Sequence, residues 1–235
     1  MQNLLKSTTA LLFSISIFSQ GNINSNIVGS SQQALIDLGN RSPRSLQPEN
    51  IQGSHYFDQD FKLSKLEYFG KELNDSGFMR YNAFRDEIEM ADTPGQSESD
   101  LILIKSKDVI PLIDGERYEY IPHRVEEGRA YIGYLIKIFE GNDNTLYLKR
   151  KKTFMEAVIA RTSLENSFPP RYVESTDIYI SINGDTPIPL KRSKNAITSF
   201  FRNNSDKIKK YIKSEKLRLS EDQSIVKIFE FAENL

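Results

Sequence analysis

Residues 80–90, RYNAFRDEIEM, hold the densest group of side chains suited to chemistry. Arg80, Asn82, Glu87 and Glu89 stand at alternating positions, so they share one face if this stretch forms a β-hairpin. Glu87 and Glu89 would lie about 6.5–7 Å apart on one strand, which overlaps the spacing of the acid and the base in glycosidases. These four side chains are the candidate ligand-binding residues, and no residue is assigned as catalytic or as a metal ligand.

A structural interpretation of the same stretch competes with the catalytic one, and we favour it. If 78–83 and 86–90 are the two arms, a single register separates apolar from polar side chains and places opposite charges across from each other. A Phe-Arg pair suits a two-residue primed turn poorly, but a four-residue loop from Ala83 to Asp86 keeps this register. We expect the polar pairs to be exposed. The cross-strand pairs are then Met79–Met90, Arg80–Glu89, Tyr81–Ile88 and Asn82–Glu87.

Other candidates for chemistry are weaker. His55 and His123 are the only histidines and lack metal-ligand spacing, so we expect both at the surface or in loops. The stretch DQD at 58–60 lacks the downstream Gly and Glu of a calcium loop, and no nucleophile elbow or phosphate loop occurs. KRKK at 149–152 alternates between the two faces of a strand. The chain has no cysteine, which excludes thiol catalysis, and the sequence predicts no cofactor.

Composition places the chain among ordinary globular proteins. Its 235 residues are 38% hydrophobic and 27% charged, with a formal net charge of −1. That length suits one domain with appendages, and the charge gives no overall bias toward nucleic acid. Residues 191–218 carry ten Lys or Arg against two Asp or Glu, whereas residues 20–190 carry 19 against 26.

The first 19 residues have the order of charge, apolar run and small residue that is typical of a secretory signal peptide. Lys6 supplies the charge, 10–18 form the apolar run, and Ser19 precedes the expected cleavage point. A buried N-terminal helix or strand is the alternative. Residues 20–52 are rich in Asn, Ser, Gln and Gly and predict a flexible polar leader. No later stretch is long and apolar enough for a transmembrane helix.

Residues 53–190 have the spacing of an antiparallel β domain. Asp114-Gly115 and Asn183-Gly184 are hairpin-turn dipeptides, and further turn signals lie at Gly70 and at EGNDN, 140–144. These signals predict a meander of about eight to ten strands. Residues 101–104 and 131–139 are apolar on both alternating faces, so we expect them to be covered on both sides. The sheet should therefore curl into a half-barrel or a sandwich.

Residues 191–235 change to helical periodicity and predict a subdomain of about three short helices packed on the sheet. Ser193 and Ser205 are the expected caps of the first two, and Ser220 with Gln223 predicts a capping box for the third. The expected apolar stripes contain Ile197, Phe200, Phe201, Ile208, Tyr211, Ile212, Ile225, Ile228 and Phe229.

Four stretches together resemble a family of exported proteins widespread in Bacteroidota. They are GSHYFDQDF (53–61), LEYFGKEL, MRYNAFRDEIEM and the segment from TPIPLKRSKN to the last residue. The resemblance covers about residues 53–235, and His55 departs from it, since proline is usual there. It implies an extracytoplasmic, mainly β protein with C-terminal helices. The family has no established activity, so the resemblance carries over no catalytic residue.

These observations favour an exported protein of the periplasm or cell surface that acts as a non-catalytic binding or accessory module. Its partner would be another cell-envelope component or an apolar or glycan ligand, and not nucleic acid. One alternative is a carboxylate-based glycan hydrolase that uses Glu87 and Glu89. Another is a small outer-membrane β-barrel, although most of the predicted strands are shorter than the 9–11 residues that such strands need.

Overall fold

The computed structural model describes residues 36–37, 51–73, 77–99, 101–162, 164 and 166–235. The predicted signal peptide, 1–19, lies outside these residues. Of the predicted leader, 20–52, the structure describes only four residues. Of these, 36–37 pair with a strand of the sheet, and Gln52 forms a bridge with Arg171.

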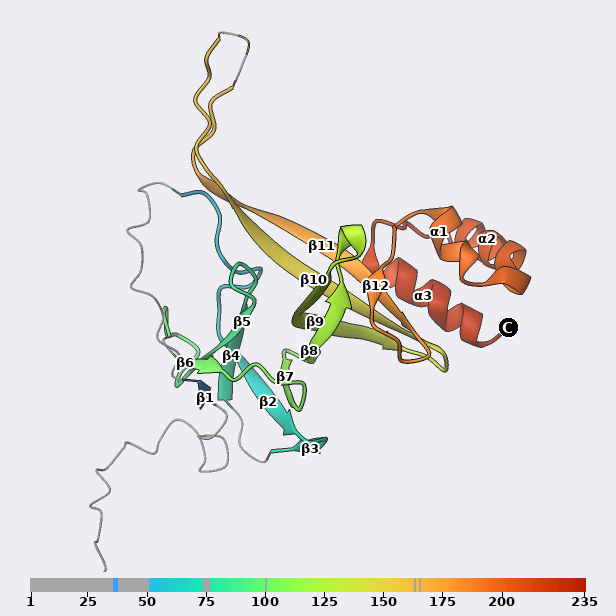
Figure 1. Cartoon of the computed structure of the whole chain (residues 1–235), viewed down its shortest axis with the longest axis horizontal. Helices are drawn as coiled ribbons and strands as arrows, with labels where there is room; N and C mark the ends of the chain where they lie inside the picture. Colours follow the sequence, from blue (N-terminus) through green and yellow to red (C-terminus); the bar gives the residue numbers. More distant parts are fainter. Residues whose placement is uncertain (1–35, 38–50, 74–76, 100, 163, 165) are drawn as a thin grey trace, which may run out of the picture.

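Twelve strands form one sheet (Figure 1), in the order β1-β6-β5-β4-β2-β7-β8-β9-β10-β11-β12, with β3 paired to β2. The neighbouring strands pair antiparallel, which short hairpin connections favour. The strands are β1 (Ile36–Asp37), β2 (Lys62–Tyr68), β3 (Lys71–Glu72), β4 (Gly77–Asn82), β5 (Glu87–Ala91), β6 (Leu101–Leu103), β7 (Val109–Ile113), β8 (Glu116–Arg124), β9 (Ala130–Glu140), β10 (Asn144–Met155), β11 (Arg171–Ile182) and β12 (Ile188–Pro189).

Primed turns connect the strands where the sequence predicts them. Asp114 and Gly115 both have positive φ, at 51° and 80°, and Ile113 pairs with Glu116 on either side of them. Asn183 and Gly184 also have positive φ. This backbone matches the twist of the flanking strands, which is why Asn-Gly and Asp-Gly are favoured there.

The β4–β5 hairpin confirms the predicted register. Its pairs are Met79–Met90, Arg80–Glu89, Tyr81–Ile88 and Asn82–Glu87, and the turn occupies residues 83–86. The tip reaches across the curled sheet to β9 and β10. There the amide of Lys152 donates to the carbonyl of Ala83 at 3.1 Å. The structure thus confirms the predicted fold, an antiparallel half-barrel with three C-terminal helices.

Two apolar clusters lie on opposite faces of the sheet. The large one fills the space between the curled sheet and the helices, and it runs from Leu66 on β2 through Tyr134 on β9 to Phe229 in the last helix. The small one contains Leu135, Tyr147 and Tyr179, with Ile121 packed against them. Successive residues of β9 alternate between the two clusters, as strand geometry requires. This explains why 131–139 is apolar on both faces.

Three α-helices, α1 (Lys194–Ser199), α2 (Ser205–Ser214) and α3 (Asp222–Glu233), lie at one end of the sheet. The Ser193 hydroxyl accepts the amide of Ala196, which confirms the first predicted cap. The other two predicted caps were wrong, because Ser205 is already the first residue of α2 and Glu221 precedes α3 without a side-chain cap bond. Across the described residues, no helix is long and apolar enough to cross a membrane.

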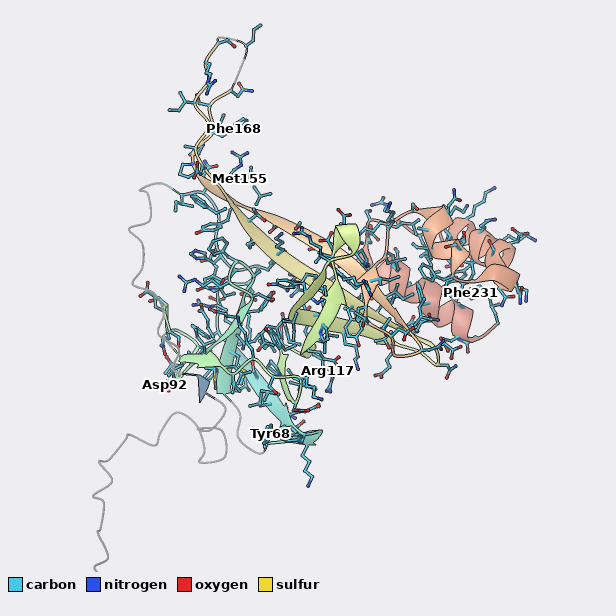
Figure 2. The ribbon with its side chains drawn as sticks, in the orientation of Figure 1. Tyr68, Asp92, Arg117, Met155, Phe168 and Phe231 are labelled. Atoms are coloured by element: carbon cyan, nitrogen blue, oxygen red, sulfur yellow. The ribbon has the colours of Figure 1, made fainter. Side chains whose placement is uncertain are left out.

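Beyond Met155 and Arg171, the last paired residues of β10 and β11, the chain continues as an arm that projects away from the helices, with Phe168 along it (Figure 2). Val158 and Phe168 exchange two backbone hydrogen bonds, of 2.9 and 2.8 Å, which hold the two sides of the arm together. Both side chains are about half exposed.

Candidate functional site

The first candidate residues, Arg80 and Glu89, are buried, not exposed as expected. Their side chains are 4% and 1% exposed, and Nη2 of Arg80 lies 2.6 Å from Oε2 of Glu89. The guanidinium is sandwiched between the rings of Tyr56 and Phe61, at 3.8 and 4.1 Å from the ring centroids. The N-terminal segment that carries these two rings covers the face that the hairpin alone would leave in water.

Asn82 joins the same network. Its Nδ2 donates to Oε1 of Glu89 at 2.9 Å, while its Oδ1 accepts the amides of Phe84 and Arg85 at 3.2 and 3.0 Å. The hydroxyl of Tyr56 also donates to Glu89. A buried charged pair needs such additional bonds to offset its desolvation. Three of the four candidate residues therefore hold the hairpin and its turn in shape.

Glu87, the fourth candidate, lies apart from this network. Its Oε1 is 3.6 Å from Nζ of Lys105, and its buried Oε2 has no hydrogen-bond partner among the described residues. Glu87 and Glu89 share a strand face but do not line the cavity described next, so the structure does not bring them together over a substrate-sized space.

A cavity of about 570 Å³ lies on the outer face of β8–β11, on the side of the small apolar cluster. The tip of the β4–β5 hairpin forms one wall, and the loop between β8 and β9 forms another. The cavity lining includes Phe84, Asp86, His123, Glu126, Tyr131, Lys149, Lys151, Asp177 and Tyr179.

Asp86 fixes the hairpin tip onto this face. Its φ is +56°, and its two carboxylate oxygens accept the amide of Tyr134, each at 3.3 Å. A Cβ atom on Gly133 would collide with that carboxylate, so the missing side chain at 133 makes room for Asp86. Tyr81 donates a further hydrogen bond to Asp86 at 2.6 Å.

Lys149 on β10 completes the floor of the cavity. Its Nζ lies 2.7 Å from Oδ1 of Asp86 and donates to the carbonyl of Tyr134 at 3.0 Å. The side chain is almost fully buried. Burial lowers the pKa of Lys149, and the neighbouring Asp86 opposes this by favouring the charged amine. The ion pair thus neutralises a charge that burial would otherwise make costly.

His123 lies beside this pair and is 1% exposed, which corrects the expectation of a surface histidine. Its Nδ1 is 3.1 Å from the carbonyl of Ile121, a geometry that assigns the proton to Nδ1 in the neutral ring. The rings of Tyr131 and Tyr179 meet it edge-on, at 5.4 and 5.2 Å. Burial lowers the pKa of His123, so the imidazole is neutral near pH 7.

The rim of the cavity is aromatic and charged. Tyr131 and Phe84 are 48% and 42% exposed, and they come from β9 and from the hairpin tip. Burial, Asp177 and Glu126 all raise the pKa of the Tyr179 phenol, and both carboxylates line the cavity together with it. Neither carboxylate has an ion-pair partner within the described part of the chain.

The alternation predicted for 149–152 is confirmed. Lys149 and Lys151 line the cavity, whereas Arg150 and Lys152 pair with Glu116 and Glu174 on the opposite face. Strand alternation predicts which side chains of β10 face the site, whereas the meeting of Gly133, Asp86 and His123 depends on long-range contacts.

Among the described residues, no group of three or more His, Asp or Glu side chains is arranged to hold a metal ion. Comparison of the chain with protein families, curated proteins and solved structures gave no match.

Proposed function

We propose that this chain is an exported cell-envelope protein that binds a ligand in the cavity on the outer face of β8–β11 and does not transform it. The export part of the proposal is supported by Lys6 and the apolar run at 10–18. The binding part is supported mainly by one observation: an open cavity with exposed aromatic rings at its rim and a floor of polar groups held in place by one another. Such a combination is typical of ligand sites.

A binding role fits the chemistry of the floor better than a catalytic one. The amine of Lys149 is occupied by Asp86, and Nδ1 of His123 by a backbone carbonyl. Both groups are therefore fixed by the fold, as a preorganised binding surface requires. Three acidic and three basic side chains line the cavity, so its formal charges balance. We infer a ligand of small net charge, with polar groups beside an apolar face.

The direct test is a nuclear magnetic resonance screen of the mature protein against a panel of neutral oligosaccharides and blocked peptides. Ligands of this site should shift the resonances of Tyr131, His123 and Lys149, and Tyr131→Ala should weaken binding at least tenfold. Tyr68→Ala is the matched control, because Tyr68 is a 37% exposed tyrosine at the β2–β3 end of the sheet (Figure 2). Equal loss of binding in both variants, or shifts confined to other surfaces, would contradict the proposal.

A further inference from the structure

One edge of β11 is only partly paired. Along one edge, β11 pairs with β10 over its whole length. Along the opposite edge, the amide of Tyr172 donates to the carbonyl of Gln52 at 2.9 Å, and the carbonyl of Ile178 accepts the amide of Leu190 at 2.8 Å. Between these two contacts lies an open stretch that contains Glu174 and Thr176.

The backbone groups of this stretch point away from β10. In an antiparallel pair, alternate residues direct both their N–H and C=O groups to the same side. Tyr172 and Ile178 use backbone groups on the side away from β10. The N–H and C=O groups of Glu174 and Thr176 therefore point to that side as well. Their outward amides and carbonyls have no hydrogen-bond partner in the described part of the chain. A row of unpaired, alternating donors and acceptors is the template that an added strand recognises.

The open stretch borders the cavity. Asp177 and Tyr179 of β11 line it, so a strand added outside β11 would direct every second side chain toward the same face. The carboxylates of Asp177 and Glu126 line the cavity on this side together with Tyr179, and both raise the pKa of its phenol. They form an acidic position beside the open edge, and a cationic side chain would complement it.

We propose that the partner of this site is an extended polypeptide segment. It adds to β11 between Gln52 and Leu190 and places one basic side chain against Asp177 and Glu126. This inference rests on the proposed function and names the ligand class. The distance from Tyr172 to Ile178 corresponds to about 20 Å of strand, which accommodates about five residues. The open edge of β11 presents alternating amides and carbonyls. A glycan has no matching row of backbone amides and carbonyls to pair with them.

The test uses three blocked heptapeptides and isothermal titration calorimetry. The first is Thr-Val-Thr-Lys-Thr-Val-Thr, the second has Glu in place of Lys, and the third has the first sequence with N-methylated backbone amides. Strand addition predicts that the Lys peptide binds and that the Glu and N-methylated peptides bind at least tenfold more weakly. The Glu126→Gln and Asp177→Asn double variant should also lose about tenfold affinity for the Lys peptide.

Thr176→Pro tests the edge from the protein side. Since the amide of Thr176 points outward, proline removes no bond to β10, and its ring occupies the space of the added strand. Thr176→Val keeps the edge and is the matched control. The proline variant should lose binding while the valine variant retains it. A circular dichroism melt establishes that both variants are folded. If the proline variant does not fold, the N-methylated peptide still tests strand addition on the wild-type protein.

The outcomes separate the two proposals. If oligosaccharides shift Tyr131 but no peptide binds, strand addition is overturned and the cavity remains a binding site. Equal binding of the N-methylated and unmodified peptides also overturns it. If no member of the first panel shifts Tyr131 and no heptapeptide binds, the proposed function falls, and this inference falls with it.

Discussion

Glu89→Gln tests whether the hairpin network is as important to stability as its burial implies. The substitution keeps the shape of the side chain but removes its charge, so the guanidinium of Arg80 loses its buried counter-ion 2.6 Å away. It also replaces one of the two carboxylate oxygens, which together accept from Arg80, Asn82 and Tyr56, by an NH2 group, which cannot accept a hydrogen bond. Breaking one partner of a buried pair typically costs about 3–5 kcal/mol, a large part of the 5–15 kcal/mol stability typical of a domain.

The measurement is urea unfolding followed by circular dichroism, because the chain has no tryptophan. Glu72→Gln is the control, since Glu72 pairs with Lys65 at 2.8 Å while both side chains are more than half exposed. An exposed pair contributes about 0–1 kcal/mol. A loss of less than about 1 kcal/mol for Glu89→Gln, equal to that of the control, would refute the argument from burial.

The other predictions concern the cavity floor, the helices and acid stability. Asp86→Asn and Lys149→Met should each lower the free energy of unfolding by about 3 kcal/mol, and the double variant should cost less than the sum of the two in urea unfolding. Phe229→Ala should cost about 3–5 kcal/mol because it empties a buried site, whereas the exposed Lys207→Glu should change stability by less than about 0.5 kcal/mol. The lowered pKa of His123 means that the folded protein favours the neutral ring. Its contribution is therefore fully present above the ordinary histidine pKa of about 6.5 and is lost as pH falls through the lower, folded-state value. Melting temperatures between pH 7 and 5 should fall less steeply for His123→Gln than for the wild type.

The register of the hairpin followed from the sequence because local rules determine it. Met79 and Tyr81 alternate with Arg80 and Asn82, and only one pairing places both apolar residues on one face. The burial of the polar face did not follow. It depends on Tyr56, which precedes the hairpin by more than 20 residues and whose packing leaves no periodic signal.

The cavity shows the same limit of sequence analysis. Strand alternation places Lys149 and Lys151 on one face, but it cannot show that the hairpin tip reaches that face. Contact between Asp86 and the backbone at Gly133 joins segments almost fifty residues apart. A glycine inside a predicted strand signals a close backbone approach, and here that signal indicates the position of the site.

The large apolar cluster joins Leu66 near the start of the sheet to Phe229 in the last helix. A chain built in this way cannot complete its core as it leaves the ribosome, because the early strands must wait for residues synthesised more than 150 positions later. Contacts of such long range slow folding and leave apolar strands open to aggregation in the meantime. The sequence separation within the core therefore sets a time interval in which chaperones and proteases compete for the nascent protein.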